Sequence, residues 1–148
     1  MRALSPSIND PHTAMSVLDR LGADLCDAAK LHLATGVTLR GGVPALVQPS
    51  IDYDGLVDAM FHLIRQSAAG SAAILIRMVD VLIAVAGCER DPARLAVLQR
   101  HADLILGDAE KTVRTPSDLE DLLQRHRRFA VVRQRGALAG LVSWANNH

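Results

Sequence analysis

An almost continuously apolar segment at residues 72–86, AAILIRMVDVLIAVA, limits the fold more than any other feature. Arg77 and Asp80 interrupt it, and it is shorter than the run of about 20 apolar residues that crosses a bilayer. A helix that is apolar on nearly every face must be surrounded by other elements. The segment therefore predicts a helix in the middle of a bundle, with Gly87 as its end.

Four other segments show apolar residues at helical spacing, each bounded by a capping residue, a proline or a glycine. The expected helices span about 11–33, 53–68, 92–113 and 116–133, and Gly136 is expected to end the last. In the second of them, the face expected to be buried carries Leu56, Met60, Leu63 and Ile64.

Residues 37–47 have a different pattern, with two short β-prone runs around Gly41-Gly42. They predict a small hairpin, in which Pro44 requires an edge strand and which needs a helix beneath it. The predicted fold is thus all-α, a bundle of about five helices with one small β-hairpin. Residues 1–135 are expected to form the helical domain, and 136–148 a tail with an apolar patch that is suited to dock on the bundle or on a partner.

Composition narrows the functional classes. The chain has 148 residues with sixteen basic and sixteen acidic side chains, which excludes a globally basic nucleic-acid binder. Its two cysteines, Cys26 and Cys88, lie in apolar surroundings and predict two buried free thiols in a reducing compartment. No signal peptide or membrane span is visible, so a cytoplasmic or membrane-associated location is expected. The sequence also lacks the common catalytic, cofactor and metal motifs, which favours a protein that is not an enzyme and has neither cofactor nor metal.

The polar opening of the chain is the first candidate site. Arg2, Ser5, Asn9 and Asp10 lie close together around the start of a helix, where free N–H groups and the helix dipole favour an anion. A small anionic ligand is one interpretation. The other, which is favoured, is a capped helix with no ligand.

A polar stripe on the second helix is another candidate, because carboxylates and an imidazole can bind a divalent metal. The stripe is Asp54, Asp58, His62 and Arg65. An amphipathic helix also needs a polar face, so a solvated surface is the favoured interpretation.

Arg77 and Asp80 are three residues apart on the most apolar helix, so they are expected to pair with each other. Such a buried pair is either structural or lines a ligand pocket, and Arg65 is expected nearby.

Residues 111–135 carry seven basic and three acidic side chains, a net charge of +4. The basic surface comprises Arg125, Arg127, Arg128, Arg133 and Arg135. It is suited to an anionic surface such as lipid headgroups, although a solvated helix is the favoured interpretation. Nucleic acid is disfavoured because aromatic side chains for base stacking are missing.

The opening pattern RALSPSINDPHTA at 2–14, with LDRLG at 18–22, resembles a bacterial family of predicted membrane proteins of unknown function. IRQ at 64–66 and LIR at 75–77 are also similar, and the resemblance extends over about 110 residues. It implies a two-part design, with N-terminal transmembrane helices and a soluble C-terminal part that this chain looks like. It implies no activity or cofactor, but it adds weight to the opening motif, Arg65 and Arg77.

We therefore expect a regulatory or assembly module beside a membrane. Apolar residues make up 49% of the chain, and exposed apolar patches often mark association, so a homo-oligomer, most simply a dimer, is expected. A small-anion sensor or enzyme built from the opening motif, Arg65, Arg77 and Asp80 is the first alternative. Binding of an anionic surface through the basic fifth helix is the second.

Overall fold

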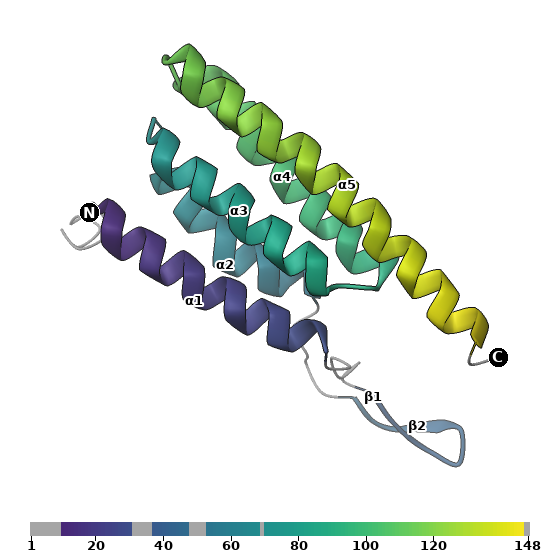
Figure 1. The fold of residues 1–148 in the computed structure, drawn as a ribbon. Helices are drawn as coiled ribbons and strands as arrows, with labels where there is room; N and C mark the ends of the chain where they lie inside the picture. Colours follow the sequence, from purple (N-terminus) through teal and green to yellow (C-terminus); the bar gives the residue numbers. More distant parts are fainter. Residues whose placement is uncertain (1–9, 31–36, 48–52, 69, 147–148) are drawn as a thin grey trace, which may run out of the picture.

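The computed structural model of the protein describes residues 10–30, 37–47, 53–68 and 70–146. The five helices among them form a bundle, which confirms the predicted helical class (Figure 1). The helices are α1 (Pro11–Ala29), α2 (Tyr53–Ser67), α3 (Ala72–Cys88), α4 (Pro92–Thr112) and α5 (Pro116–Asn146).

The core is built around α3, as the apolar segment predicts. This helix packs against α1, α4 and α5, and nine of its side chains are buried. The buried residues of α3 are Ile74, Leu75, Met78, Val79, Val81, Leu82, Ile83, Val85 and Ala86. Apolar side chains on most faces of α3 are removed from water when other helices surround it. The hydrophobic effect therefore favours the central position of α3.

The connections between α2, α3, α4 and α5 are short, so each of these helices reverses the direction of the one before it (Figure 1). Gly70 has a φ of 87° in the turn between α2 and α3, a conformation that favours glycine. As a result α1, α3 and α5 run in the same direction, and α2 and α4 run in the opposite one.

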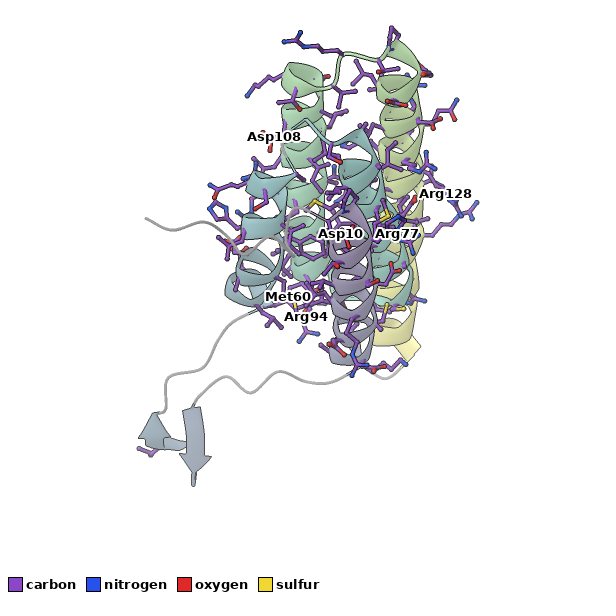
Figure 2. The ribbon with its side chains drawn as sticks, turned by 90° about the vertical axis from the view of Figure 1, so that its left-hand side faces the viewer. Asp10, Met60, Arg77, Arg94, Asp108 and Arg128 are labelled. Carbon is purple, nitrogen blue, oxygen red and sulfur yellow. The ribbon has the colours of Figure 1, made fainter. Side chains whose placement is uncertain are left out.

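Two short antiparallel strands, β1 (Val37–Arg40) and β2 (Val43–Val47), follow α1 and precede α2 in the sequence. Gly41 and Gly42 form the turn with φ values of 61° and 80°. The hairpin stands off the bundle in Figures 1 and 2, and no helix of the described residues lies beneath it. The expected packing of a helix under the strands is therefore not supported, and the strands add no layer to the all-helical fold.

The predicted end of the fifth helix is wrong. Gly136 does not terminate α5, which continues to Asn146. A Cβ atom at Gly136 would lie 2.9 Å from the carbonyl oxygen of Glu89 and 3.3 Å from that of Ala86. Glycine is present because α5 approaches the backbone at the end of α3 closely. The expected boundary between residues 135 and 136 thus falls inside a helix. The apolar patch expected in the tail is Leu138, Leu141, Val142 and Trp144, and the structure describes the helical backbone of these residues but not their side chains.

Candidate functional site

Asp10 caps the first turn of α1, as predicted. Its carboxylate accepts hydrogen bonds from the backbone N–H groups of His12 at 3.2 Å and Thr13 at 3.3 Å, and from the Thr13 hydroxyl at 2.8 Å. The hydroxyl bond is the main reason that the pKa of Asp10 lies below its ordinary value. The other residues of this candidate site, Arg2, Ser5 and Asn9, lie outside the described residues.

The predicted pair of Arg77 and Asp80 is wrong. Arg77 instead donates two parallel hydrogen bonds, of 2.7 and 2.6 Å, to Asp19 on α1. Asp80 accepts a hydrogen bond of 2.9 Å from Arg125 on α5. Residues three apart on one helix differ by about 60° around its axis, so they share a side of the helix but can reach different neighbours. Here Arg77 reaches α1 and Asp80 reaches α5. Each charge therefore pairs with a neighbouring helix.

Arg65 does not lie beside Arg77. It forms a salt bridge with Asp108 of α4, and both side chains are partly buried. In Figure 2 Asp108 lies on the opposite side of the molecule from Arg77 and Arg128. The described cations of the predicted anion site are thus separated, and each is already paired with a carboxylate.

The polar stripe of α2 faces α4 rather than solvent alone, which corrects the favoured interpretation. Arg100 of α4 forms salt bridges with Asp54 and with Asp58, the latter at 3.2 Å. His62 is exposed and does not join them. The predicted apolar face is partly confirmed, because Leu56, Met60 and Ile64 are partly buried against the core. The buried residues of α2 are Tyr53, Val57 and Phe61.

The imidazole that contacts Asp58 belongs to His101 of α4, which the sequence analysis did not select. Its Nε2 atom lies 2.7 Å from Oδ1 of Asp58. With Asp54, these residues bring three potential metal ligands within 4.8 Å of one another. Arg100 contacts both carboxylates and offsets one of their two negative charges, so the geometry is that of a salt-bridge network joining α2 to α4.

His101 is only 2% exposed, and its ring lies against that of Phe61 with centroids 6.0 Å apart. Burial lowers the pKa of His101 from its ordinary value of 6.5, and this outweighs the nearby Asp58 carboxylate, which acts in the opposite direction. The imidazole is therefore neutral in the folded protein at neutral pH.

The lowered pKa of His101 predicts a loss of stability in mild acid. Above pH 6.5 the imidazole is neutral in both the folded and the unfolded chain. Below that pH the unfolded chain takes up a proton that the folded chain resists, so the free energy of unfolding falls until the folded pKa is passed. A pH titration of the His101 ring protons by NMR should give a midpoint below 6.5. A midpoint at or above that value contradicts the prediction.

The predicted basic surface on α5 is only partly available. Arg125 forms salt bridges with Asp80 at 2.9 Å and with Asp121 at 3.7 Å. Arg127 and Arg128 are exposed. Arg133 is half-buried, and Arg135 is exposed. The pairing of Arg125 lowers the positive charge that this face presents to an anionic surface.

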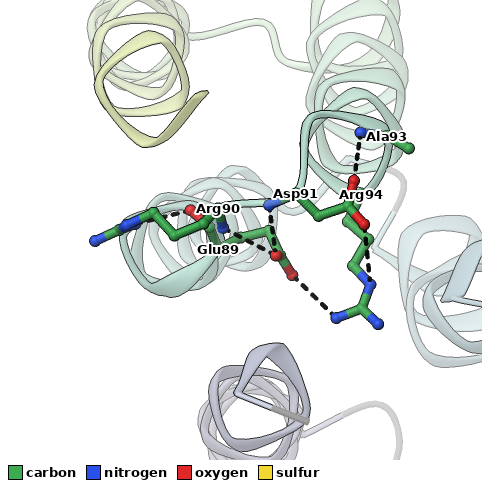
Figure 3. Close-up of polar contacts among 5 residues, drawn as sticks. All are labelled: Glu89, Arg90, Asp91, Ala93 and Arg94. Atoms are coloured by element: carbon green, nitrogen blue, oxygen red, sulfur yellow. Dashed lines mark hydrogen bonds and ion pairs between the residues drawn. The ribbon is translucent and has the colours of Figure 1, made fainter. Parts of the chain in front are cut away.

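A buried polar cluster at the turn between α3 and α4 was also not predicted (Figure 3). Glu89 is 2% exposed, and its Oε1 accepts hydrogen bonds from the backbone N–H groups of Arg90 at 2.9 Å and Asp91 at 3.0 Å. Its Oε2 lies 3.7 Å from Arg94, whose guanidinium lies 5.1 Å from the ring centre of Tyr53. These contacts satisfy the backbone N–H groups of a tight turn and connect the turn to Tyr53 of α2. Burial also raises the pKa of Tyr53.

The two cysteines lie in contact, which the sequence analysis did not foresee. The Sγ atoms of Cys26 and Cys88 are 3.1 Å apart. Both thiols are free, but Cys26 is only half-buried and Cys88 is exposed. The prediction of two buried thiols is therefore wrong, because both residues lie where α1 and α3 end and packing is incomplete.

An apolar groove of about 580 Å³ runs between α1 and α2. Val17 and Leu63 line this groove, and their exposed fractions are 45% and 64%. None of the described residues that line it carries a charge. They are Thr13, Ala14, Val17, Leu21, Ala59, Met60, Leu63, Ile64, Ser67, Ala68 and Ile74. The prediction that Leu63 is buried is wrong, and the sequence signal that corrects it is the stripe of Tyr53, Val57 and Phe61, which carries the tyrosine and the phenylalanine of this helix.

Among the described residues, no helix combines the length and the apolar character required to span a bilayer. A family model described as "Predicted membrane protein (DUF2254)" matches residues 1–84. This span is shorter than the resemblance expected from the sequence, and it ends within α3. Comparison with curated proteins and with solved structures finds no match.

Proposed function

Since the chain belongs to the family of predicted membrane proteins whose model matches residues 1–84, we propose that it is an assembly module of that family and self-associates through the α1–α2 groove. The observation that carries the proposal is the uncharged groove with Val17 and Leu63 exposed on it. Exposed apolar patches on the surface of a soluble protein often mark interaction sites.

A second copy of the chain is the occupant that this surface favours. A two-fold interface must be complementary to itself, so it needs both protruding side chains and a hollow that receives them. Val17 and Leu63 provide the first, and the groove beside them provides the second. Two copies also meet without repulsion, because the groove is uncharged and the whole chain has a formal net charge of zero.

The energy available favours weak, reversible association. Fully burying an exposed leucine or valine side chain contributes about 1.5–3 kcal/mol. Val17 and Leu63 are 45% and 64% exposed, so each contributes roughly half of that, and a two-fold interface buries each of them twice. Part of that gain offsets the loss of translational and rotational freedom. We therefore expect a dimer that forms at micromolar concentration.

The test is sedimentation velocity of the full chain at micromolar concentrations. The wild type is expected to sediment as a dimer, and Leu63→Glu to sediment as a monomer because a carboxylate cannot be buried in an apolar interface without a partner. Leu63 is exposed, so the variant should keep the helical content of the wild type by circular dichroism.

Val131→Glu is the matched control. Val131 is 49% exposed on α5 and does not line the groove, so this variant should remain dimeric. A wild type that is monomeric at high micromolar concentration overturns the proposal. So does a Leu63→Glu variant that dimerises as strongly as the wild type.

A further inference from the structure

The contact between Cys26 and Cys88 joins two helices that run in the same direction. Cys26 lies near the end of α1 and Cys88 is the last residue of α3, and the two are 62 positions apart in the sequence. Their sulfur atoms, 3.1 Å apart, need to move about 1 Å closer to reach the bond length of a disulfide, about 2.05 Å. A rotation of the exposed Cys88 side chain at the helix end can provide such a movement.

The backbone around the pair is held in register by contacts that precede it on both helices. Gly22 allows α1 to approach Val81 so closely that a Cβ atom at Gly22 would lie 2.7 Å from Val81 Cγ1. One turn earlier, Arg77 and Asp19 form two hydrogen bonds between the same helices. The Cys26 thiol itself lies 3.6 Å from the carbonyl oxygen of Ala84, to which it donates a weak hydrogen bond. The proximity of the two sulfurs is thus built into the α1–α3 packing.

The two thiols differ in accessibility. Cys88 is exposed, whereas Cys26 is half-buried between the helices. Burial, with the neighbouring Cys88 sulfur, raises the pKa of Cys26 to about 12. An external reagent therefore meets Cys88 first, and Cys26 is placed to react with the sulfur that Cys88 carries.

We propose that Cys26 and Cys88 are a redox-active dithiol that forms a reversible disulfide by exchange with a small-molecule disulfide, and that the bond locks α1 to α3. This assignment is independent of the proposed self-association.

The exchange has two steps. The Cys88 thiol releases its proton to solvent, and its sulfur attacks one sulfur of the small-molecule disulfide. This attack forms a mixed disulfide on Cys88 and releases the first small thiolate. That thiolate takes up a proton from solvent. The Cys26 sulfur then attacks the Cys88 sulfur and displaces the second small thiolate, which accepts the Cys26 proton. The two protein thiols lose two electrons in total, and the small-molecule disulfide gains them as two small thiols.

The experiment treats the full chain with oxidised glutathione, blocks the remaining thiols with iodoacetamide and measures the intact mass. The expected product is a monomeric chain lighter by two hydrogen atoms, with neither label nor glutathione, and with Cys26 linked to Cys88 in a digest. The melting temperature should rise by about 10 °C, because the link closes a long loop in the unfolded chain, and dithiothreitol should reverse the shift.

Two single variants test the roles of the cysteines. Cys26→Ser should accumulate a stable glutathione adduct on Cys88, because no second thiol is present to displace it. Cys88→Ser should react much more slowly, because Cys26 is half-buried and holds its proton. The proposal is overturned if the oxidised wild type keeps both thiols, carries glutathione on Cys88 without a link to Cys26, or forms only links between chains.

Discussion

Replacing Phe129 with alanine should lower the free energy of unfolding by about 3–5 kcal/mol. Phe129 is fully buried on α5, within the same apolar cluster as Leu82 of α3 and Leu98 of α4. Without the ring, the folded protein loses the free energy gained by removing the ring from water. A cavity also remains, which the three packed helices cannot close. The measurement is urea-induced unfolding followed by circular dichroism.

Val131→Ala is the control for this substitution. Val131 lies two residues further along the same helix and is 49% exposed, so the free energy of unfolding should change by no more than about 0.5 kcal/mol. Equal effects of Phe129→Ala and Val131→Ala contradict the packing of α5 described above. The comparison also bears on the extent of the folding unit, because Phe129 lies outside the residues 1–84 that the family model matches. A large effect at Phe129 means that the following helices complete the core.

Replacing Gly136 with alanine should destabilise the protein by about 1–3 kcal/mol, although alanine is the better helix former. The new Cβ atom would lie 2.9 Å from the carbonyl oxygen of Glu89, and a backbone atom at a helix end cannot rotate away as a side chain can. Either α5 shifts, or the turn that holds the buried Glu89 carboxylate is disturbed.

Gly107→Ala is the matched comparison. Gly107 also lies inside a helix, α4, but a Cβ atom there would meet nothing within 4 Å. Alanine should therefore increase the free energy of unfolding by about 0.5–1 kcal/mol through its lower backbone entropy in the unfolded chain. The two substitutions are chemically identical and are expected to have opposite signs in the same urea titration. A stabilising Gly136→Ala would contradict the close approach of α5 and α3.

Several elements could be predicted because their causes are local. Asp10 and Asp91 mark helix starts through their own carboxylates, which accept hydrogen bonds from N–H groups two or three residues away. The central place of α3 follows from its apolar residues, because no face of the helix has enough polar side chains to lie against water. Gly136 shows the limit of this reasoning. A glycine after a helical run usually ends the helix, but here a contact with a distant segment requires it.

The candidate sites depended on contacts between residues that are far apart in the sequence. Asp80 pairs with Arg125 rather than Arg77, and Asp58 contacts His101 rather than His62. Spacing along one helix can be read directly from the sequence, so in each case it favours a partner on the same helix. Which residues of two different helices meet depends on the rotation and offset of those helices, and these are set by the packing of all the side chains between them.

The sequence by itself determined the helical class, most helix starts and the buried position of α3, since these depend on short-range hydrogen bonding and on the hydrophobic effect along one element. Only the tertiary structure decided the ion pairs, the contact of Cys26 with Cys88 and the apolar groove beside Leu63. The physical reason is that a pair, a bond or a groove belongs to two helices together, so its geometry depends on how they dock and not on the pattern of either one.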